Sequence, residues 1–221
     1  MFDFDAIVFD MDGVILDTER MALKSWVLLA DKYGLEGIEE VALKCVGRNT
    51  AATTQMLLDT YGEDLDIEGL YKESKELLMK LFEENGGIPL KSGAKELLMW
   101  LRDNGHRVGL ASSTRYATIV RQLTDAGLID CFEVIVGGDM VKNSKPLPDI
   151  YLTACEKLGV DPKRAMAVED SKNGIISAHA AGMKTVLVPD LIKPDEEMLE
   201  KADLKLSSLD ELLEKLVNAG K

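Results

Sequence analysis

Two aspartates separated by a single residue, Asp10 and Asp12, directly follow a short apolar run at residues 5–9. A carboxylate at the end of a strand can attack phosphorus and form an acyl phosphate. A second carboxylate two residues further on can give a proton to the leaving oxygen and later take one from water. Gly13 lets the chain turn, so that the backbone near Asp12 can approach a metal ion. The pair is therefore compatible with phosphoryl chemistry, with Asp10 as the nucleophile and Asp12 as the general acid and base, although two such aspartates can also cap a helix or form an Asx turn.

Further reactive side chains follow other apolar runs of the chain. Ser112 and Ser113 come after the run at 107–111, and Glu169 and Asp170 come after the run at 164–168. Four carboxylates at one place repel each other unless a cation lies between them. A hard divalent cation bound through oxygen meets that need, and Mg²⁺ prefers a few carboxylates together with water and substrate phosphate. We therefore expect a Mg²⁺ site formed by Asp10, Asp12, Glu169 and Asp170.

Lys145 lies in the segment Lys-Pro-Leu-Pro-Asp at 145–149, which the two prolines make rigid. Lysine and serine or threonine hydroxyls are suitable groups to surround a phosphoryl group. Lys145 and the hydroxyls of Ser112 and Ser113 are therefore candidates for catalysis and phosphate binding, and the sequence pattern does not decide which of the two adjacent serines faces the phosphate. The sequence leaves open whether Thr114 and Arg115 face the phosphate or another part of the protein.

The elements that must position these residues alternate between strands and helices. Strand-like runs occupy 5–9, 107–111, 132–136, 164–168 and 184–188, and amphipathic helical stretches occupy 93–104, 115–127, 148–159 and 172–181. Strands separated by helices of this length form a parallel sheet with right-handed crossovers. In such a sheet ligands bind beyond the carboxyl ends of the strands, where the reactive residues lie. The expected fold class is α/β, with a Rossmann-like parallel sheet as its core.

Residues 17–84 differ from this alternation because their apolar positions have helical spacing throughout. The flexible segment Asn85-Gly86-Gly87 marks the return to the sheet. We therefore expect a core domain formed by residues 1–16 and 86–221, with an inserted all-helical domain at 17–85. The capped amphipathic stretch that begins at Ser207 is expected to form a helix covering the sheet.

Composition excludes several classes of protein. The net charge of −13 disfavours binding to nucleic acid or to an anionic membrane, because both need clustered lysine and arginine. Neither a secretory leader nor an apolar stretch of membrane-spanning length is visible, so we expect a cytoplasmic protein. The cysteines, Cys45, Cys131 and Cys155, are odd in number and widely separated, which indicates buried free thiols. The sequence leaves the oligomeric state open, and a monomer is compatible with it.

Four motifs together resemble the haloacid dehalogenase-like superfamily, in its phosphatase and beta-phosphoglucomutase-like branch with a helical cap. They are FDMDGVILDTE at 9–19, LASS at 110–113, KPLPD at 145–149 and VEDS at 168–171. The resemblance implies that Asp10 is both nucleophile and metal ligand, and that Asp12 binds the metal through its carbonyl. It implies that Ser112 and Lys145 hold the phosphoryl group. It also implies that Asp170 binds Mg²⁺ directly while Glu169 supports the ion through water.

The resemblance also bears on the substrate. The segment around Arg48 is similar to one that contacts substrate in this branch, although a surface arginine is an alternative. In beta-phosphoglucomutase a histidine follows the Asp-Thr pair, whereas this chain has Ala22 there. We therefore expect a phosphatase acting on a small phosphorylated metabolite such as a sugar phosphate, a phosphoglycolate-like acid or a nucleoside monophosphate. A sugar phosphate mutase is the alternative.

Other interpretations of the acidic motif fit less well. A calcium loop that places Gly13 at its sixth position would put Val8 at the first ligand position, and a strand where a helix should enter. A phospho-aspartate signalling switch shares the acidic cluster and the lysine, but it needs no helical insertion and would be much shorter. The combination of Asp12, Lys145 and the Glu169–Asp170 pair suits phosphoryl transfer better than dehalogenation.

Overall fold

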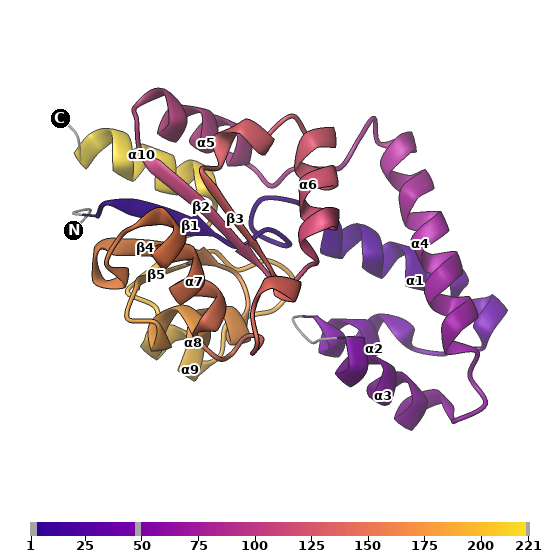
Figure 1. Ribbon diagram of the computed structural model, residues 1–221. Helices are drawn as coiled ribbons and strands as arrows, with labels where there is room; N and C mark the ends of the chain where they lie inside the picture. Colours follow the sequence, from indigo (N-terminus) through magenta and orange to yellow (C-terminus); the bar gives the residue numbers. More distant parts are fainter. Residues whose placement is uncertain (1–3, 47–49, 220–221) are drawn as a thin grey trace. The chain divides into compact units, whose positions relative to one another are not determined.

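The computed structural model describes residues 4–46 and 50–219 of the chain (Figure 1). It divides into two compact units, each described here by itself. The first, the α/β unit, comprises residues 1–16 and 90–221, and the second, the helical unit, comprises Asp17–Pro89. Among the described residues, no helix has the length and apolar character needed to cross a bilayer.

The α/β unit is built on one six-stranded sheet whose neighbouring strands are all parallel. The strands are β1 (Ala6–Phe9), β2 (Arg107–Ser112), β3 (Val134–Gly137), β4 (Ala165–Glu169), β5 (Lys184–Leu187) and β6 (Leu204–Lys205). Their order across the sheet is β3-β2-β1-β4-β5-β6. β1 is fully buried between β2 and β4, which explains why it is a continuous apolar run rather than an alternating one.

Helices cover both faces of this sheet, with α5 and α10 on one face and α7 and α8 on the other (Figure 1). The helices of the unit are α5 (Ala94–Asp103), α6 (Tyr116–Asp125), α7 (Asp149–Leu158), α8 (Lys172–Ala180), α9 (Glu196–Lys201) and α10 (Leu209–Ala219). Short 3₁₀ turns lie at 129–131, 138–140 and 162–164. The chain passes from β3 at one edge back to β4 beside β1, so the winding changes direction next to β1. Ligands bind at such a switch point.

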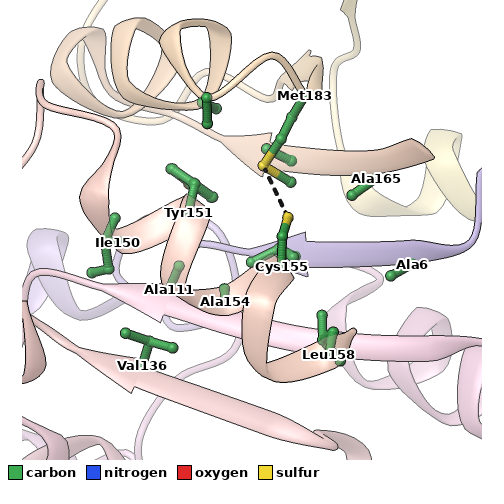
Figure 2. Packing of buried hydrophobic residues seen from close by; sticks show 14 residues of the cluster. Ala6, Ala111, Val136, Ile150, Tyr151, Ala154, Cys155, Leu158, Ala165 and Met183 are labelled. Carbon is green, nitrogen blue, oxygen red and sulfur yellow. Dashed lines mark hydrogen bonds between the residues drawn. The ribbon is translucent and has the colours of Figure 1, made fainter. Parts of the chain in front are cut away.

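The core under α7 joins that helix to the middle of the sheet (Figure 2). Tyr151, Ala154 and Leu158 recur on one face of α7 and are buried against small residues of the strands, including Ala111. Alanines on the strands let the helix approach closely while the larger side chains of α7 fill the space. α7 is therefore packed firmly against the sheet, and it anchors the end of the loop that precedes it.

The α/β fold class predicted from the sequence is confirmed, and each predicted strand is present with bounds shifted by no more than two residues. Helix α10 packs against α5 and so covers the sheet as expected. The strand β6 and the short helix α9 were not predicted. Each is too short to produce a periodic pattern, and β6 forms only by pairing with β5 at the sheet edge.

The helical unit consists of α1 (Thr18–Tyr33), α2 (Ile38–Cys45), α3 (Thr50–Tyr61) and α4 (Ile67–Glu84). Leu35, Leu57 and Leu70 form the centre of its apolar core. The hydroxyls of Ser25 on α1 and Ser74 on α4 are buried and lie 2.7 Å apart, so each satisfies the other where the two helices pack. This unit therefore has a core of its own.

Candidate active site

Asp10 follows the last residue of β1, and its backbone N–H donates to the carbonyl of Val168 on β4 (3.0 Å). Only 8% of the residue is exposed. Burial, partly offset by the ammonium of Lys145, raises the pKa of Asp10 to about 7. The sheet thus holds this carboxylate at the carboxyl end of its central strand, in a place that strongly favours a nearby cation.

Lys145 supplies one such cation. Its Nζ lies 2.5 Å from Oδ1 of Asp10, 2.6 Å from Oε1 of Glu169 and 3.0 Å from the carbonyl of Ala111. Burial alone would lower the pKa of Lys145, but the Asp10 and Glu169 carboxylates outweigh burial and raise it. The Lys145 side chain is only 6% exposed, so its ammonium is charged and held by three acceptors.

The loop that carries Lys145 is tied down at both ends. Ser177 on α8 is fully buried and donates its hydroxyl to the carbonyl of Leu147 (2.7 Å). Asn143 donates to Oδ1 of Asp149, the first residue of α7 (2.8 Å). These contacts explain how a loop lysine reaches a carboxylate 135 positions away in the sequence.

Glu169 is the last residue of β4 and is completely buried. Its Oε1 accepts from Lys145 and from the hydroxyl of Tyr151 (2.7 Å), and its Oε2 accepts from the backbone N–H of Asp170 and from Ser171 at 3.1–3.3 Å. A side chain on Gly174 would meet the carboxyl group of Glu169 at 1.9 Å. Glu169 is therefore locked in one orientation, and a glycine on α8 makes the room for it.

Asp170 comes next in the chain and is 5% exposed. Gly13 approaches it so closely that a Cβ there would lie 2.4 Å from Oδ2, and its φ of +81° is a backbone conformation that glycine adopts readily. One carboxylate oxygen each from Asp10, Glu169 and Asp170 lies within 4.8 Å of the others. An all-oxygen, all-carboxylate set of buried ligands fits a hard divalent cation such as Mg²⁺.

Ser112, the last residue of β2, and the three residues after it differ in burial and in their contacts. Ser112 is 1% exposed, and its hydroxyl accepts from the backbone N–H of Thr114 (3.1 Å), whereas Ser113 is exposed. Thr114 donates its hydroxyl to Oδ2 of Asp12 (2.9 Å). The sequence left the role of Thr114 open. Its place two residues after the end of a strand was the available signal, because a side chain there can reach a neighbouring loop. Arg115 is exposed at the start of α6.

The histidines and the cysteines of the chain are not part of this cluster. Arg48 lies outside the described residues. His106 stacks on Trp100 with ring centroids 5.2 Å apart, and His179 is exposed on α8. The three cysteines are buried thiols that form no disulfide, as predicted.

The helical unit contains a cavity of about 210 Å³ between α1, α2 and the start of α3. Its walls are formed by Glu19, Ala22, Leu23, Trp26, Ala42, Cys45, Val46 and Thr53. The lining is mostly apolar, with one carboxylate and one threonine hydroxyl among it. Ala22 is part of this wall.

Comparisons with known proteins agree with this geometry. The chain is 37% identical over 210 residues to the "Putative phosphatase YhcW" of Bacillus subtilis, with 94% of this chain and 93% of that protein covered. It is 30% identical over 214 residues to a phosphorylated carbohydrates phosphatase of Thermotoga maritima, with 95% and 96% covered. A crystal structure from Thermotoga maritima described as a putative beta-phosphoglucomutase superposes with a TM-score of 0.80 at 29% identity, with 97% and 99% covered.

A family model described as haloacid dehalogenase-like hydrolase matches residues 7–188. That range begins within β1 and ends just after β5, so it includes every carboxylate and the lysine of the cluster. Several relatives carry the name phosphatase, in agreement with a site built around an aspartate, a lysine and a set of oxygen ligands. The chain belongs to the haloacid dehalogenase-like hydrolase family, as a phosphoric monoester hydrolase of its phosphatase and beta-phosphoglucomutase-like branch.

Proposed function

We propose that this protein is a Mg²⁺-dependent phosphatase that hydrolyses a small phosphorylated metabolite through an aspartyl phosphate at Asp10. The observation that carries the proposal is the contact of Lys145 with both Asp10 and Glu169, beside the buried carboxylate of Asp170. This arrangement supports the proposal because a nucleophile, a fixed positive charge and a set of cation ligands would then lie together near the ends of two neighbouring strands. Each is a requirement of phosphoryl transfer.

In the first step, a carboxylate oxygen of Asp10 attacks phosphorus, and the bond between phosphorus and the leaving oxygen breaks. Asp12 gives its proton to that oxygen, so the product leaves as a neutral alcohol. Thr114 holds Oδ2 of Asp12, which orients the carboxyl group for this transfer. Lys145 and Ser112 hold the phosphoryl oxygens as negative charge develops on them.

In the second step, a water molecule attacks the phosphorus of the aspartyl phosphate. Asp12 now takes a proton from that water, the bond between Asp10 and phosphorus breaks, and inorganic phosphate leaves. Asp12 thereby returns to its protonated form and Asp10 to its carboxylate. The cycle consumes one water per phosphate ester.

Asp10, Asp170 and the carbonyl of Asp12 would hold Mg²⁺, with Glu169 supporting the site from behind. When bound, the ion supplies charge that neutralises the carboxylates and the phosphoryl group together. The donor groups fit this role because they are oxygens, they are buried and they lie near each other. Lys145 by itself places one positive charge among three carboxylates.

We further propose that the helical unit determines which phosphate ester is accepted. A cavity of about 210 Å³ suits a small metabolite, and the name of one relative, a phosphorylated carbohydrates phosphatase, favours a sugar phosphate. Ala22 in the cavity wall cannot assist a proton transfer on a sugar. This favours hydrolysis over transfer of the phosphoryl group to a second position of the sugar.

The test is hydrolysis of a panel of phosphate esters with Mg²⁺ and with EDTA, using Asp10→Asn as the inactive control. We expect release of phosphate from at least one sugar phosphate, dependent on both Mg²⁺ and Asp10. Interconversion of glucose 1- and 6-phosphates with little release of phosphate would establish the mutase instead. A long-lived phosphate on Asp10 without turnover would establish a signalling switch.

A further inference from the structure

Tyr151 lies in the hydrophobic core and contacts the reactive cluster from the core side. It lies on α7 and is completely buried. Its hydroxyl donates to Oε1 of Glu169 at 2.7 Å, and the same oxygen accepts from Nζ of Lys145 at 2.6 Å. That Nζ also lies 5.1 Å from the centroid of the Tyr151 ring. One side chain thus touches both the lysine and the carboxylate that holds it.

The ring of Tyr151 packs among apolar side chains that need no hydroxyl (Figure 2). Ala111, Val136, Ile150 and Ala154 belong to the same buried cluster. A phenylalanine would fill this space equally well, whereas a buried hydroxyl costs free energy unless it finds a partner. The hydroxyl is therefore explained by its bond to Glu169 rather than by packing.

We propose that Tyr151 is a positioning residue. Its hydroxyl donates to one of the two lone pairs of Glu169 Oε1, which weakens the hold of Glu169 on Lys145 and so keeps the Lys145 ammonium in contact with Asp10. The inference rests on the proposed role of Lys145 in holding phosphate. Oε1 has two lone-pair directions, and the tyrosine takes one of them while the lysine takes the other. Oε2 is already bonded to Asp170 and Ser171. Glu169 therefore shares its charge among several donors and holds Lys145 less tightly than a bare carboxylate would.

Loss of the hydroxyl changes this division in one direction. With Oε1 free of the tyrosine, its whole attraction acts on Lys145, and the ammonium moves toward Glu169 and away from Asp10. The phosphoryl group, which Lys145 must also contact, is then held less well. In the Tyr151→Phe variant we expect the dissociation constant of inorganic phosphate to rise roughly three- to tenfold, the range of one hydrogen bond. KM should rise by the same factor, and kcat should fall as well, because Lys145 also contacts the phosphoryl oxygens as negative charge develops on them.

The experiment is calorimetric titration of inorganic phosphate, with Mg²⁺ present, into the full-length wild type, Tyr151→Phe and Thr185→Val. Thr185 is a matched control because it is a completely buried hydroxyl on β5, bonded to the carbonyl of Lys201 (2.5 Å) and not to the cluster. Circular dichroism shows that each variant is folded, and the midpoint of thermal unfolding measures its loss of stability. We expect Thr185→Val to lose stability without any change in phosphate binding.

Phosphate binding by Tyr151→Phe that equals the wild type would overturn the inference, as would an equal weakening in both variants. This test of Tyr151 is independent of the proposed hydrolysis, because a titration with inorganic phosphate needs no turnover. If the wild type binds phosphate but hydrolyses no ester, the proposed function fails while the comparison of Tyr151→Phe with wild type still decides the role of Tyr151. If the wild type does not bind phosphate, both proposals fail.

Discussion

Nζ of Lys145 lies 2.5 Å from Oδ1 of Asp10, although 135 positions separate the two residues in the chain. The same ammonium lies 2.6 Å from Glu169, so one cation joins two buried carboxylates that come from neighbouring strands. Charged groups with so little exposure depend on each other, because none of them has water to replace a lost partner. The pair therefore links the stability of the fold to the chemistry of the site.

Lys145→Met tests this link. Lys145 donates to oxygens on which negative charge develops, and removing one such donor lowers kcat roughly 100- to 1,000-fold. Breaking a buried ion pair also costs roughly 3–5 kcal/mol of unfolding free energy. Burial keeps the pKa of Asp10 near 7 even with Lys145 present, and loss of the lysine raises it further. A carboxyl whose pKa is higher in the folded state destabilises that state at high pH, and the penalty disappears as the pH falls.

Urea unfolding of Lys145→Met and wild type should therefore show a large stability difference at pH 8 that shrinks toward pH 5. Lys172→Met is the matched control, because Lys172 pairs with Asp195 at 2.7 Å in an exposed position. It should lose little stability at either pH and keep its activity. Equal stability of Lys145→Met and wild type at pH 8 would contradict the coupling of Lys145 to the two carboxylates.

Addition of Mg²⁺ should raise the midpoint of thermal unfolding, and by more at pH 8 than at pH 6. A concentration of 100 times the dissociation constant contributes about 2.7 kcal/mol, or roughly 5–10 °C for a chain of this length. The pH dependence follows because Asp10, whose pKa burial raises to about 7, must release its proton before it can bind the cation. Differential scanning fluorimetry with and without EDTA measures the shift.

Asp170→Asn should remove most of this Mg²⁺ shift, because Asp170 is one of the buried carboxylates of the cluster. Asp125→Asn changes an exposed carboxylate at the end of α6 and should keep the shift of the wild type. An equal shift at pH 6 and pH 8 would argue against Asp10 as a ligand.

Thr114→Val should lower kcat by up to roughly tenfold, the effect of one hydrogen bond. The valine keeps the shape of the threonine but leaves Oδ2 of Asp12 without the hydroxyl that lies 2.9 Å away. Thr114→Ser keeps the hydroxyl and should recover most of the activity. Steady-state kinetics measures both, with Thr124→Val, an exposed hydroxyl on α6, as the control. A Thr114→Val variant as active as wild type would show that Asp12 needs no such support.

Gly174→Ala should inactivate the enzyme, because the added Cβ would lie 1.9 Å from the carboxyl group of Glu169 and force it away from Lys145. Overpacking of this kind costs roughly 1–3 kcal/mol. Gly105→Ala is a control of similar cost, since its φ of +72° disfavours alanine by about 1–2 kcal/mol while nothing lies within 4 Å of the new Cβ. Both variants should unfold at lower urea concentration, but only Gly105→Ala should keep its activity.

The sequence alone determined the main architecture because that information is local. Apolar runs of strand length separated by amphipathic helices predict a parallel sheet, and the structure has one. The reactive residues could be found because parallel strands bring their carboxyl ends to one edge. Asp10, Ser112 and Glu169 stand at or just after the ends of three strands, and their positions in the chain already imply that they meet.

The tertiary structure alone decided how these residues are held. The bond between Tyr151 and Glu169 joins a helix to a strand, and nothing in an apolar helical face distinguishes a tyrosine with a partner from one that only packs. The closeness of Gly174 to Glu169 and the bond from Thr114 to Asp12 depend in the same way on which elements lie side by side. Periodicity and spacing describe one element at a time, whereas hydrogen bonds and close packing depend on distances between elements that only the folded chain sets.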